Sequence, residues 1–327
     1  MIFELQKTRF DLKVNWKLSR NSTTFKENYI VKLQTNSGEF FSEIAPNIRY
    51  GETPENIQEQ FNAWLNTVEL KKITDIATLT EALDGSKLFH SLRFGLESAL
   101  LSYLAREQNK SLESFLHLKT AKNVETSFSM PIIPVNEIED YLKPLARFKS
   151  LKIKVNQESA QDMISEITKH TDVKLRVDAN EGWKDLDGFI KFHDSLKGKN
   201  IELIEQPFPS VMQAEYKELK KYSKYTLLAD ESIEDVGNFA DLSQQFHAVN
   251  IKLMKTGSLI KAKELMDQAR LHKMNVMIGC MIESSIGIKY GMLYSGLADY
   301  VDLDGHLLIK DEPYGLVPEE NGYLNLI

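Results

Sequence analysis

The 327-residue sequence contains one cysteine, Cys280, and neither of the nucleotide-binding patterns GxGxxG and GxxxxGK[ST]. A single cysteine excludes an intrachain disulfide and a zinc site built from several cysteines. The seven histidines form no HExxH pair, which excludes that type of metalloprotease. No run of about 18 apolar residues is present, and the first residues lack the apolar core of a signal peptide. We therefore expect a cytoplasmic protein without a membrane partner.

The charge balance excludes a second class of function. The chain has 47 acidic and 40 basic side chains, a formal net charge of −7. This balance argues against nucleic acid as a partner, because a nucleic-acid groove requires an excess of basic side chains. The hydrophobic fraction of 42% is typical of a folded globular protein, and the length suggests about two domains.

Residues 1–120 have the pattern of a small α+β domain. The segments 28–34 and 39–45 are apolar and rich in strand-forming residues, and the turn residues between them predict an antiparallel hairpin. Helices are expected over 54–66 and 88–106. In the second helix, apolar residues recur at spacings of three and four and predict one buried stripe. The stripe consists of Phe89, Leu92, Leu96, Ala99 and Tyr103.

From about residue 121 to 310, short apolar runs alternate with amphipathic stretches of helical length. The runs cover 126–132, 151–155, 173–178, 201–205, 226–230, 247–252, 274–279 and 299–304. This alternation predicts a parallel (β/α) barrel, with an open doubly wound sheet as the alternative. We assign 311–327 to a tail that returns toward the first domain.

Charged residues stand at the ends of these otherwise apolar runs. They include Lys152, Lys154, Asp178, Glu205, Asp230, Lys252, Asp302 and Asp304. From Lys154 to Lys252 the intervals are 22 to 27 residues, one βα unit each, so the side chains should meet at one mouth of the barrel. The alternative for any single acid is a helix N-cap. Three buried carboxylates together require a cation, and all-oxygen ligands favour Mg²⁺.

The lysines suggest the chemistry. Lys152 and Lys154 lie two residues apart on one strand and face the same side, whereas Lys252 lies four strands further round. A metal that holds a substrate carboxylate stabilises an enediolate, while one lysine removes the α-proton and the other returns it. This is racemisation or epimerisation. With one lysine active, the same site suits β-elimination or cycloisomerisation.

These stretches resemble the enolase superfamily, in particular its muconate lactonizing enzyme subgroup. The matching residues are Leu151–Val155 (LKIKV), Val177–Trp183 (VDANEGW), Ile204–Pro207 (IEQP), Ala229–Ser232 (ADES) and Asn250–Lys255 (NIKLMK). The resemblance implies an α+β capping domain on a (β/α)7β TIM-like barrel, with one Mg²⁺ per subunit. It further implies that Asp178, Glu205 and Asp230 bind the metal, that Lys154 and Lys252 are the acid/base pair, and that Lys152 assists at the substrate carboxylate or at Lys154. Asn180 and Glu231 would support the ligands.

Two further stretches resemble dipeptide epimerases of the L-Ala-D/L-Glu type. They are Ile278–Ser284 (IGCMIES) and Asp302–Gly305 (DLDG). The resemblance implies that Asp302 and Asp304 hold the substrate ammonium group, although Asp-Gly is also a plain turn signal. Met281 and Glu283 are further substrate-contact candidates, with helix capping as the alternative for Glu283. In the capping domain, Arg20 or Arg49 could hold an acidic side chain of the substrate.

The predicted function is Mg²⁺-dependent epimerisation of a dipeptide such as L-Ala-L-Glu, with the dipeptide as a small-molecule partner and homo-oligomers common in the superfamily. Two relatives with the same lysines and metal remain open, o-succinylbenzoate synthase and N-acylamino acid racemase. Neither substrate carries an ammonium group for Asp302 and Asp304 to bind. A catalytically inactive barrel that only binds a ligand is the alternative outside enzymes, and it has no need of two opposed lysines.

Overall fold

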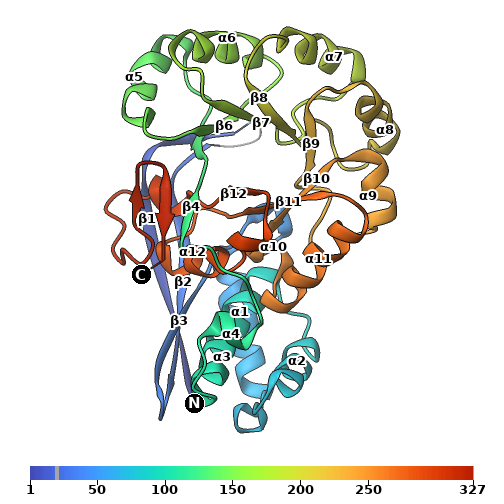
Figure 1. Ribbon diagram of the computed structural model, residues 1–327. Coiled ribbons are helices and arrows are strands. Elements are labelled where there is room, and N and C mark those ends of the chain that lie inside the picture. Colours follow the sequence, from blue (N-terminus) through green and yellow to red (C-terminus); the bar gives the residue numbers. More distant parts are fainter. Residues whose placement is uncertain (19–21, 327) are drawn as a thin grey trace.

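The computed structural model describes residues 1–18 and 22–326. Figure 1 shows two parts of the molecule, with strands β1–β3 along one side and helices α1–α4 at the end opposite helices α5–α7. The described strands form an eight-stranded sheet and two three-stranded sheets.

The capping domain begins with an antiparallel sheet of three strands. They are β1 (Ile2–Lys17), β2 (Ser22–Thr35) and β3 (Gly38–Ile44). Strands β2 and β3 pair from Tyr29↔Ile44 to Thr35↔Gly38, which confirms the predicted hairpin. The sequence analysis missed β1, whose polar residues hide its apolar positions. Strand β1 pairs with β2 from Ile2↔Gln34 to Lys17↔Ser22, and its buried Phe3 packs against Phe61 and Trp64 of the capping domain.

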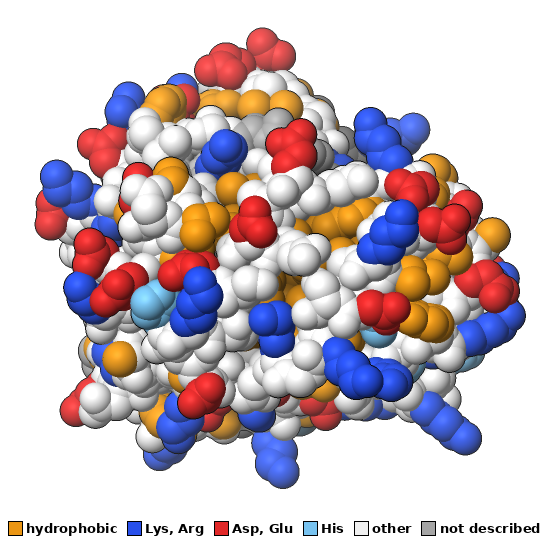
Figure 2. All heavy atoms as spheres, turned by 90° about the horizontal axis from the view of Figure 1, so that it is seen from above, with side chains coloured by type: hydrophobic (Ala, Val, Ile, Leu, Met, Phe, Trp, Pro, Cys, Tyr) orange, Lys and Arg blue, Asp and Glu red, His pale blue; other side chains and the backbone are white. Residues whose placement is uncertain are grey.

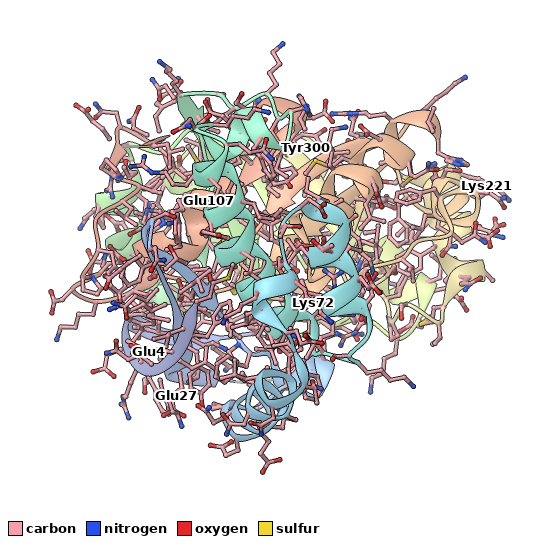
Figure 3. All side chains as sticks on the ribbon, turned by 90° about the horizontal axis from the view of Figure 1, so that it is seen from below. Glu4, Glu27, Lys72, Glu107, Lys221 and Tyr300 are labelled. Atoms are coloured by element: carbon pink, nitrogen blue, oxygen red, sulfur yellow. The ribbon has the colours of Figure 1, made fainter. Side chains whose placement is uncertain are left out.

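Helices complete the capping domain. They are α1 (Pro54–Thr67), α2 (Ile76–Asp84), α3 (His90–Glu107) and α4 (Leu112–Phe115). Thr53 caps α1 and Pro54 stands at its first position, where a missing N–H costs nothing. The predicted helices 54–66 and 88–106 are confirmed. In Figure 3, Glu4 and Glu27 mark the strand side of this domain, and Lys72 and Glu107 mark its helical side.

Helix α3 is more deeply buried than the sequence pattern predicts. Its buried residues occur on all sides and include the charged pair Arg93 and Glu97. The prediction of one buried stripe was therefore too narrow. The reason is that α3 packs against β3 and α2 in its own domain and against α10 of the barrel at the same time.

The eight predicted barrel strands are all present and parallel. They are β5 (Phe128–Met130), β6 (Ser150–Lys154), β7 (Lys174–Asp178), β8 (Ile201–Glu205), β9 (Thr226–Ala229), β10 (Ala248–Lys252), β11 (Asn275–Gly279) and β12 (Tyr300–Asp302). They lie side by side in chain order from β5 to β12. The fold is thus a (β/α) barrel with a capping domain. A doubly wound sheet is excluded, because its strand order reverses at one point, whereas these eight strands follow chain order throughout.

Helices connect the strands and cover the outside of the barrel. They are α5 (Ile138–Leu142), α6 (Ala160–His170), α7 (Leu186–Ser195), α8 (Gln213–Tyr222), α9 (Phe239–Gln245), α10 (Leu253–Thr256), α11 (Leu259–Leu271) and α12 (Ser285–Met292). Short 3₁₀ turns are η1 (Ile48–Tyr50), η2 (Leu70–Lys72), η3 (Val135–Glu137), η4 (Lys143–Leu145), η5 (Ser295–Leu297) and η6 (Gly305–Leu308). The apolar face of α6, with Met163, Ile164 and Ile167, is buried.

The seam between β5 and β12 is closed by side chains as well as backbone. Ser127 N donates to Val301 O at 3.3 Å, and Leu303 N donates to Thr126 Oγ1 at 3.0 Å. Ser127 Oγ donates to Asp302 Oδ1 at 2.7 Å, and Ser129 N donates to Asp304 Oδ2 at 2.6 Å. The predicted substrate-binding acids thus also join the first and last strands.

The tail pairs with the segment just before the barrel. Strands β13 (Glu319–Glu320) and β14 (Tyr323–Asn325) form a sheet with β4 (Asn123–Glu125). The two residues just before the tail contact the capping domain, because Ile309 bridges Leu12 and Lys310 N donates to Asp11 O.

Among the described residues, no helix is long and apolar enough to cross a membrane. Figure 2 shows acidic and basic side chains mixed over the face seen from above, without a large area of one sign.

Candidate active site

A cavity of about 680 Å³ lies at the carboxyl ends of the barrel strands, with capping-domain residues on its other side. Its barrel lining includes Ser129, Lys152, Lys154, Asn180, Asp230, Glu231, Lys252, Cys280, Met281, Ile282, Asp302 and Asp304. Its capping-domain lining includes Trp16, Leu18, Thr23, Lys26, Pro46, Asn47, Ile48, Arg49 and Tyr50. Residues predicted at one mouth from distant parts of the sequence therefore do meet there.

The three predicted metal-binding carboxylates lie at the ends of β7, β8 and just beyond β9. Asp178 and Glu205 are register partners of adjacent strands and are fully buried, and Asp230 is 3% exposed. Burial raises the pKa of Glu205, and the neighbouring Asp178 adds to this, so that the pKa reaches about 7. Three carboxylates in one buried space thus repel one another and favour a bound cation.

Lysine ammonium groups lie between these carboxylates. Lys152 Nζ lies 3.1 Å from Asp178 Oδ2, 2.8 Å from Glu205 Oε2 and 2.8 Å from Asp302 Oδ2. Although burial acts to lower it, the pKa of Lys152 is raised well above its ordinary value, chiefly by Asp302 and Glu205. Lys152 is thus a permanent cation, suited to balance the acids and not to exchange a proton.

The other lysines pair with the outer two acids. Lys154 Nζ contacts Asp178 Oδ2 at 2.5 Å, and Lys252 Nζ contacts Asp230 Oδ2 at 2.8 Å. Lys255 contacts the other carboxylate oxygen of Asp230, Oδ1, at 2.5 Å. Burial acts to lower the pKa of Lys252, but Asp230 and other carboxylates outweigh it and raise the pKa.

We tested whether these residues suit a divalent ion. No cluster of three acidic, histidine or cysteine side chains in metal-binding geometry occurs in the described part of the chain, because lysines stand between the acids. The donor set nevertheless fits. Glu205 Oε2 is buried and has no hydrogen-bond donor among the described residues. Its 2.8 Å contact with Lys152 Nζ has the distance of an ion pair but not the angles of a hydrogen bond, so this oxygen is available to a metal ion. Three carboxylates from consecutive strands are ligands that Mg²⁺ prefers.

Asp302 and Asp304 both line the cavity, as predicted from their spacing. Although burial acts in the opposite direction, Lys152 lowers the pKa of Asp302 to about 2. Burial and the charge of Asp302 raise the pKa of Asp304 to about 7. Asp304 therefore gains more than Asp302 from a cationic group placed beside it.

Residues beside the carboxylates hold them in place. Asn180 N donates to Asp178 Oδ1 at 3.1 Å, and Asn180 Nδ2 lies 3.4 Å from Glu231 Oε1. Sequence reasoning did not single out Gln206, whose Oε1 accepts from Asp230 N at 2.9 Å and from Ser232 N at 3.2 Å. Asn180 and Gln206 have φ angles of 43° and 41°, a left-handed conformation that is unfavourable for residues other than glycine.

The capping-domain side of the cavity carries two cations. Arg49 lines the cavity and pairs with Glu181 at 2.7 Å. Arg20, the other predicted cation, lies outside the described residues. Lys26 was missed from sequence because it stands within a strand. Burial lowers the pKa of Lys26, and its Nζ donates only to Pro46 O, at 3.3 Å, among the described residues.

The remaining predicted residues follow strand β11. Met281 lines the cavity, as expected. Glu283 lies outside the lining and its Oε1 accepts from Met281 N at 2.8 Å, so here it holds the loop. Burial raises the pKa of the Cys280 thiol, whose Sγ donates to Asp302 O, consistent with a packed residue and not a nucleophile.

Comparisons with known proteins identify the family of this chain. The family model described as Enolase C-terminal domain-like matches residues 136–321, more than half of the chain. An L-Ala-D/L-amino acid epimerase of Pedosphaera parvula is 32% identical over 302 residues, which cover 90% of this chain and 86% of that protein. A hydrophobic dipeptide epimerase of Roseobacter litoralis is 33% identical, with 69% and 68% covered.

A solved structure shows the same arrangement of both domains. The dipeptide epimerase of Methylococcus capsulatus, complexed with Mg and the dipeptide L-Arg-D-Lys, superposes with a TM-score of 0.83 at 25% identity. The match covers all of this chain and 96% of that one. The chain belongs to the enolase superfamily, with the dipeptide epimerases among its relatives.

Proposed function

We propose that this protein epimerises dipeptides at the α-carbon of the second residue, as in the conversion of L-Ala-L-Glu to L-Ala-D-Glu. The observation that carries the proposal is the pair Lys154 and Lys252. They line one cavity from strands β6 and β10, and each touches a different carboxylate of the central cluster. The names of the two curated relatives support the same reaction.

The two lysines act as acid and base. One takes the α-proton, and the other delivers a proton to the opposite face, which inverts the carbon. A lysine must be neutral to act as the base, but the acids around Lys252 raise its pKa. These acids must therefore be neutralised by another cation during the reaction.

We propose Asp178, Glu205 and Asp230 as the ligands of one Mg²⁺. When bound, the ion supplies positive charge that stabilises the substrate carboxylate as the α-proton leaves. Lys152, held between the same acids, adds a second fixed positive charge on the Lys154 side. Asn180 and Gln206 keep the ligand-bearing strand ends in place.

Asp302 and Asp304 are proposed to hold the substrate ammonium group. Both face the cavity, and burial and the charge of Asp302 raise the pKa of Asp304 to about 7, so a cationic group beside Asp304 would stabilise its charged form. This arrangement favours a dipeptide over an N-succinyl, N-acyl or o-succinylbenzoate-type substrate, because those lack an ammonium group. Two buried acids facing such a substrate would be repulsive.

Lys26 bears on the choice between acidic and hydrophobic dipeptides. It is a cation in the cavity wall with no carboxylate within ion-pair distance among the described residues. The adjacent Ile48 and Tyr50 are apolar or aromatic. An acidic side chain on the second residue of the substrate could form an ion pair with Lys26. We therefore propose that L-Ala-L-Glu is preferred over purely hydrophobic dipeptides.

The test is proton NMR in D₂O with Mg²⁺ and a panel of L,L-dipeptides. We expect the α-proton signal of the second residue to disappear, fastest for dipeptides that end in glutamate. N-succinyl amino acids and the o-succinylbenzoate precursor serve as comparison substrates. Exchange only on those, and on no dipeptide, would refute the proposal in favour of the racemase or synthase.

A further inference from the structure

One wall of the cavity is a short loop whose position depends on the other domain. After β11, residues Cys280, Met281 and Ile282 line the cavity, and the chain then turns into helix α12. The loop is not part of a helix or strand, so its own backbone bonds do not fix it. The contacts that hold it come from elsewhere.

Glu43, at the end of capping-domain strand β3, reaches the beginning of α12. It is fully buried and accepts from Ser284 N at 3.0 Å, Ser284 Oγ at 2.5 Å and Gly287 N at 3.1 Å. Backbone N–H groups at the start of a helix have no partner one turn before them, so a carboxylate satisfies them well. Gly287 N shares its hydrogen between Glu43 and Ser284 O, which lies 3.0 Å away. Glu43 thus fixes the end of the loop.

Asn28, on strand β2, fixes the loop one step earlier. Its Nδ2 donates to Ile282 O at 3.0 Å and to Glu43 Oε1 at 2.8 Å. Asn28 is also fully buried. The two capping-domain side chains therefore hold the loop on both sides of Glu283, and neither of them lines the cavity.

The space around these contacts is tight. A Cβ atom on Gly287 would lie 2.5 Å from Glu283 Oε2 and 3.1 Å from Glu43 Oε2. Glu283 Oε1 in turn accepts from Met281 N, which carries the constraint into the cavity wall. Because these side chains are closely packed, truncation of Glu43 or Asn28 should shift the neighbouring backbone, including Met281 and Ile282.

We propose that Glu43 and Asn28 are positioning residues that determine substrate side-chain specificity by fixing residues 280–283. This inference rests on the proposed function. It assigns the capping domain a role that does not require contact with substrate. A displacement of the wall by a fraction of an ångström changes how a side chain fits, while the lysines on β6 and β10 stay in place.

The chain offers a matched control in Glu97. This buried capping-domain glutamate accepts from Ser258 Oγ at 2.7 Å and Leu259 N at 2.5 Å, at the beginning of helix α11. Like Glu43 it joins the two domains at the start of a helix, and in addition it pairs with Arg93 at 3.0 Å. The residues just before α11, from 253 to 258, do not line the cavity.

The experiment compares Glu43→Ala, Glu43→Gln, Asn28→Ala, Glu97→Ala and Glu97→Gln in the full-length protein. The kinetic constants kcat and KM are measured for L-Ala-L-Glu and L-Ala-L-Leu, together with thermal unfolding. We expect Glu43→Ala and Asn28→Ala to change the ratio of the two kcat/KM values by about tenfold, mainly through KM. Glu43→Gln, which can still accept a hydrogen bond from Ser284, should keep the ratio of the two kcat/KM values close to that of the wild type.

The Glu97 variants should lower the melting temperature without changing that ratio. If Glu43→Ala does not fold, Asn28→Ala still tests the proposal, because Glu43 then loses one donor but keeps its contacts with Ser284 and Gly287. A ratio equal to wild type in the folded variants, or one changed equally by Glu97→Ala, would refute the positioning role alone. Absence of exchange on any dipeptide by the wild-type protein would refute the proposed function and this inference with it.

Discussion

The two sides of the cavity are lined by different types of residue. The barrel side carries buried charged side chains of both signs at the ends of strands β6 to β10 and β12. The capping-domain side is largely apolar, with Trp16, Leu18, Ile48 and Tyr50 and the cations Lys26 and Arg49. The difference indicates that the barrel side carries the reaction, and the capping-domain side selects the substrate.

The strongest test of the barrel side is removal of each lysine. Lys154→Ala and Lys252→Ala should each lower kcat for epimerisation by about 10³-fold or more, since each removes a group that transfers a proton. Each variant should still exchange the α-proton of one epimer, and the two variants should differ in which one. NMR in D₂O measures both. Equal exchange of both epimers by either variant would contradict the assignment of opposite faces.

The next largest effect is expected at the proposed metal ligands, on the affinity for Mg²⁺. Glu205→Gln should weaken Mg²⁺ binding by about 100-fold, because it removes a charge from the centre of the three carboxylates. Glu202→Gln is the control, since Glu202 lies on the same strand but pairs with Arg176 and Lys174. Calorimetric titration with Mg²⁺ alone reads the affinity. Unchanged affinity in Glu205→Gln would place the metal elsewhere.

A substitution on the capping-domain side should change selectivity and not the chemistry. Lys26→Met should raise KM for L-Ala-L-Glu by about 10- to 100-fold, the range expected for loss of a charged hydrogen bond. The kcat/KM for L-Ala-L-Leu should not fall. Lys32→Met, on the same strand, is the control because Lys32 pairs with Glu39. A similar loss on both dipeptides would assign Lys26 to folding instead.

The smallest effect is expected at Glu283, where the barrel meets the capping domain, and it concerns stability as a function of pH. Burial and Glu43 raise the pKa of Glu283 from 4.5 to about 8. Between these values the folded protein holds a proton that the unfolded chain has lost, so the free energy of unfolding should fall as pH rises through this range. Glu283→Gln should flatten this dependence and shift the melting temperature at pH 8 upward by a few degrees. Melting curves from pH 5 to 9 measure it, and parallel curves for both proteins would contradict the shifted pKa.

The barrel side could be predicted from sequence because each strand repeats the same rule. An apolar run followed by a charge at its end marks Asp178, Glu205 and Lys252 at regular intervals, and parallel strands bring such ends together. All eight strands were predicted from the apolar runs alone. The contacts of Lys152 with three acids were not predicted, because they depend on how far side chains reach across strands.

The capping-domain side followed no such rule. Strand β1 and residue Lys26 were missed, since neither breaks the local pattern of polar and apolar residues. Glu43 and Asn28 act across domains on residues more than 200 positions away in the chain. Contacts of that kind have no signal in a single sequence. The strained φ angle of Gln206 likewise follows from tertiary contacts of its amide.

The seam of the barrel limits how this protein could be converted to a new substrate. Asp302 and Asp304, the acids proposed to hold the ammonium group, also bond Ser127 and Ser129 on the first strand. A mutation that adapts the site to a substrate without an ammonium group would also loosen the joint between the ends of the barrel. Evolution or design toward such substrates would therefore need a compensating change on β5 first, so that the two acids can be lost without loss of the fold.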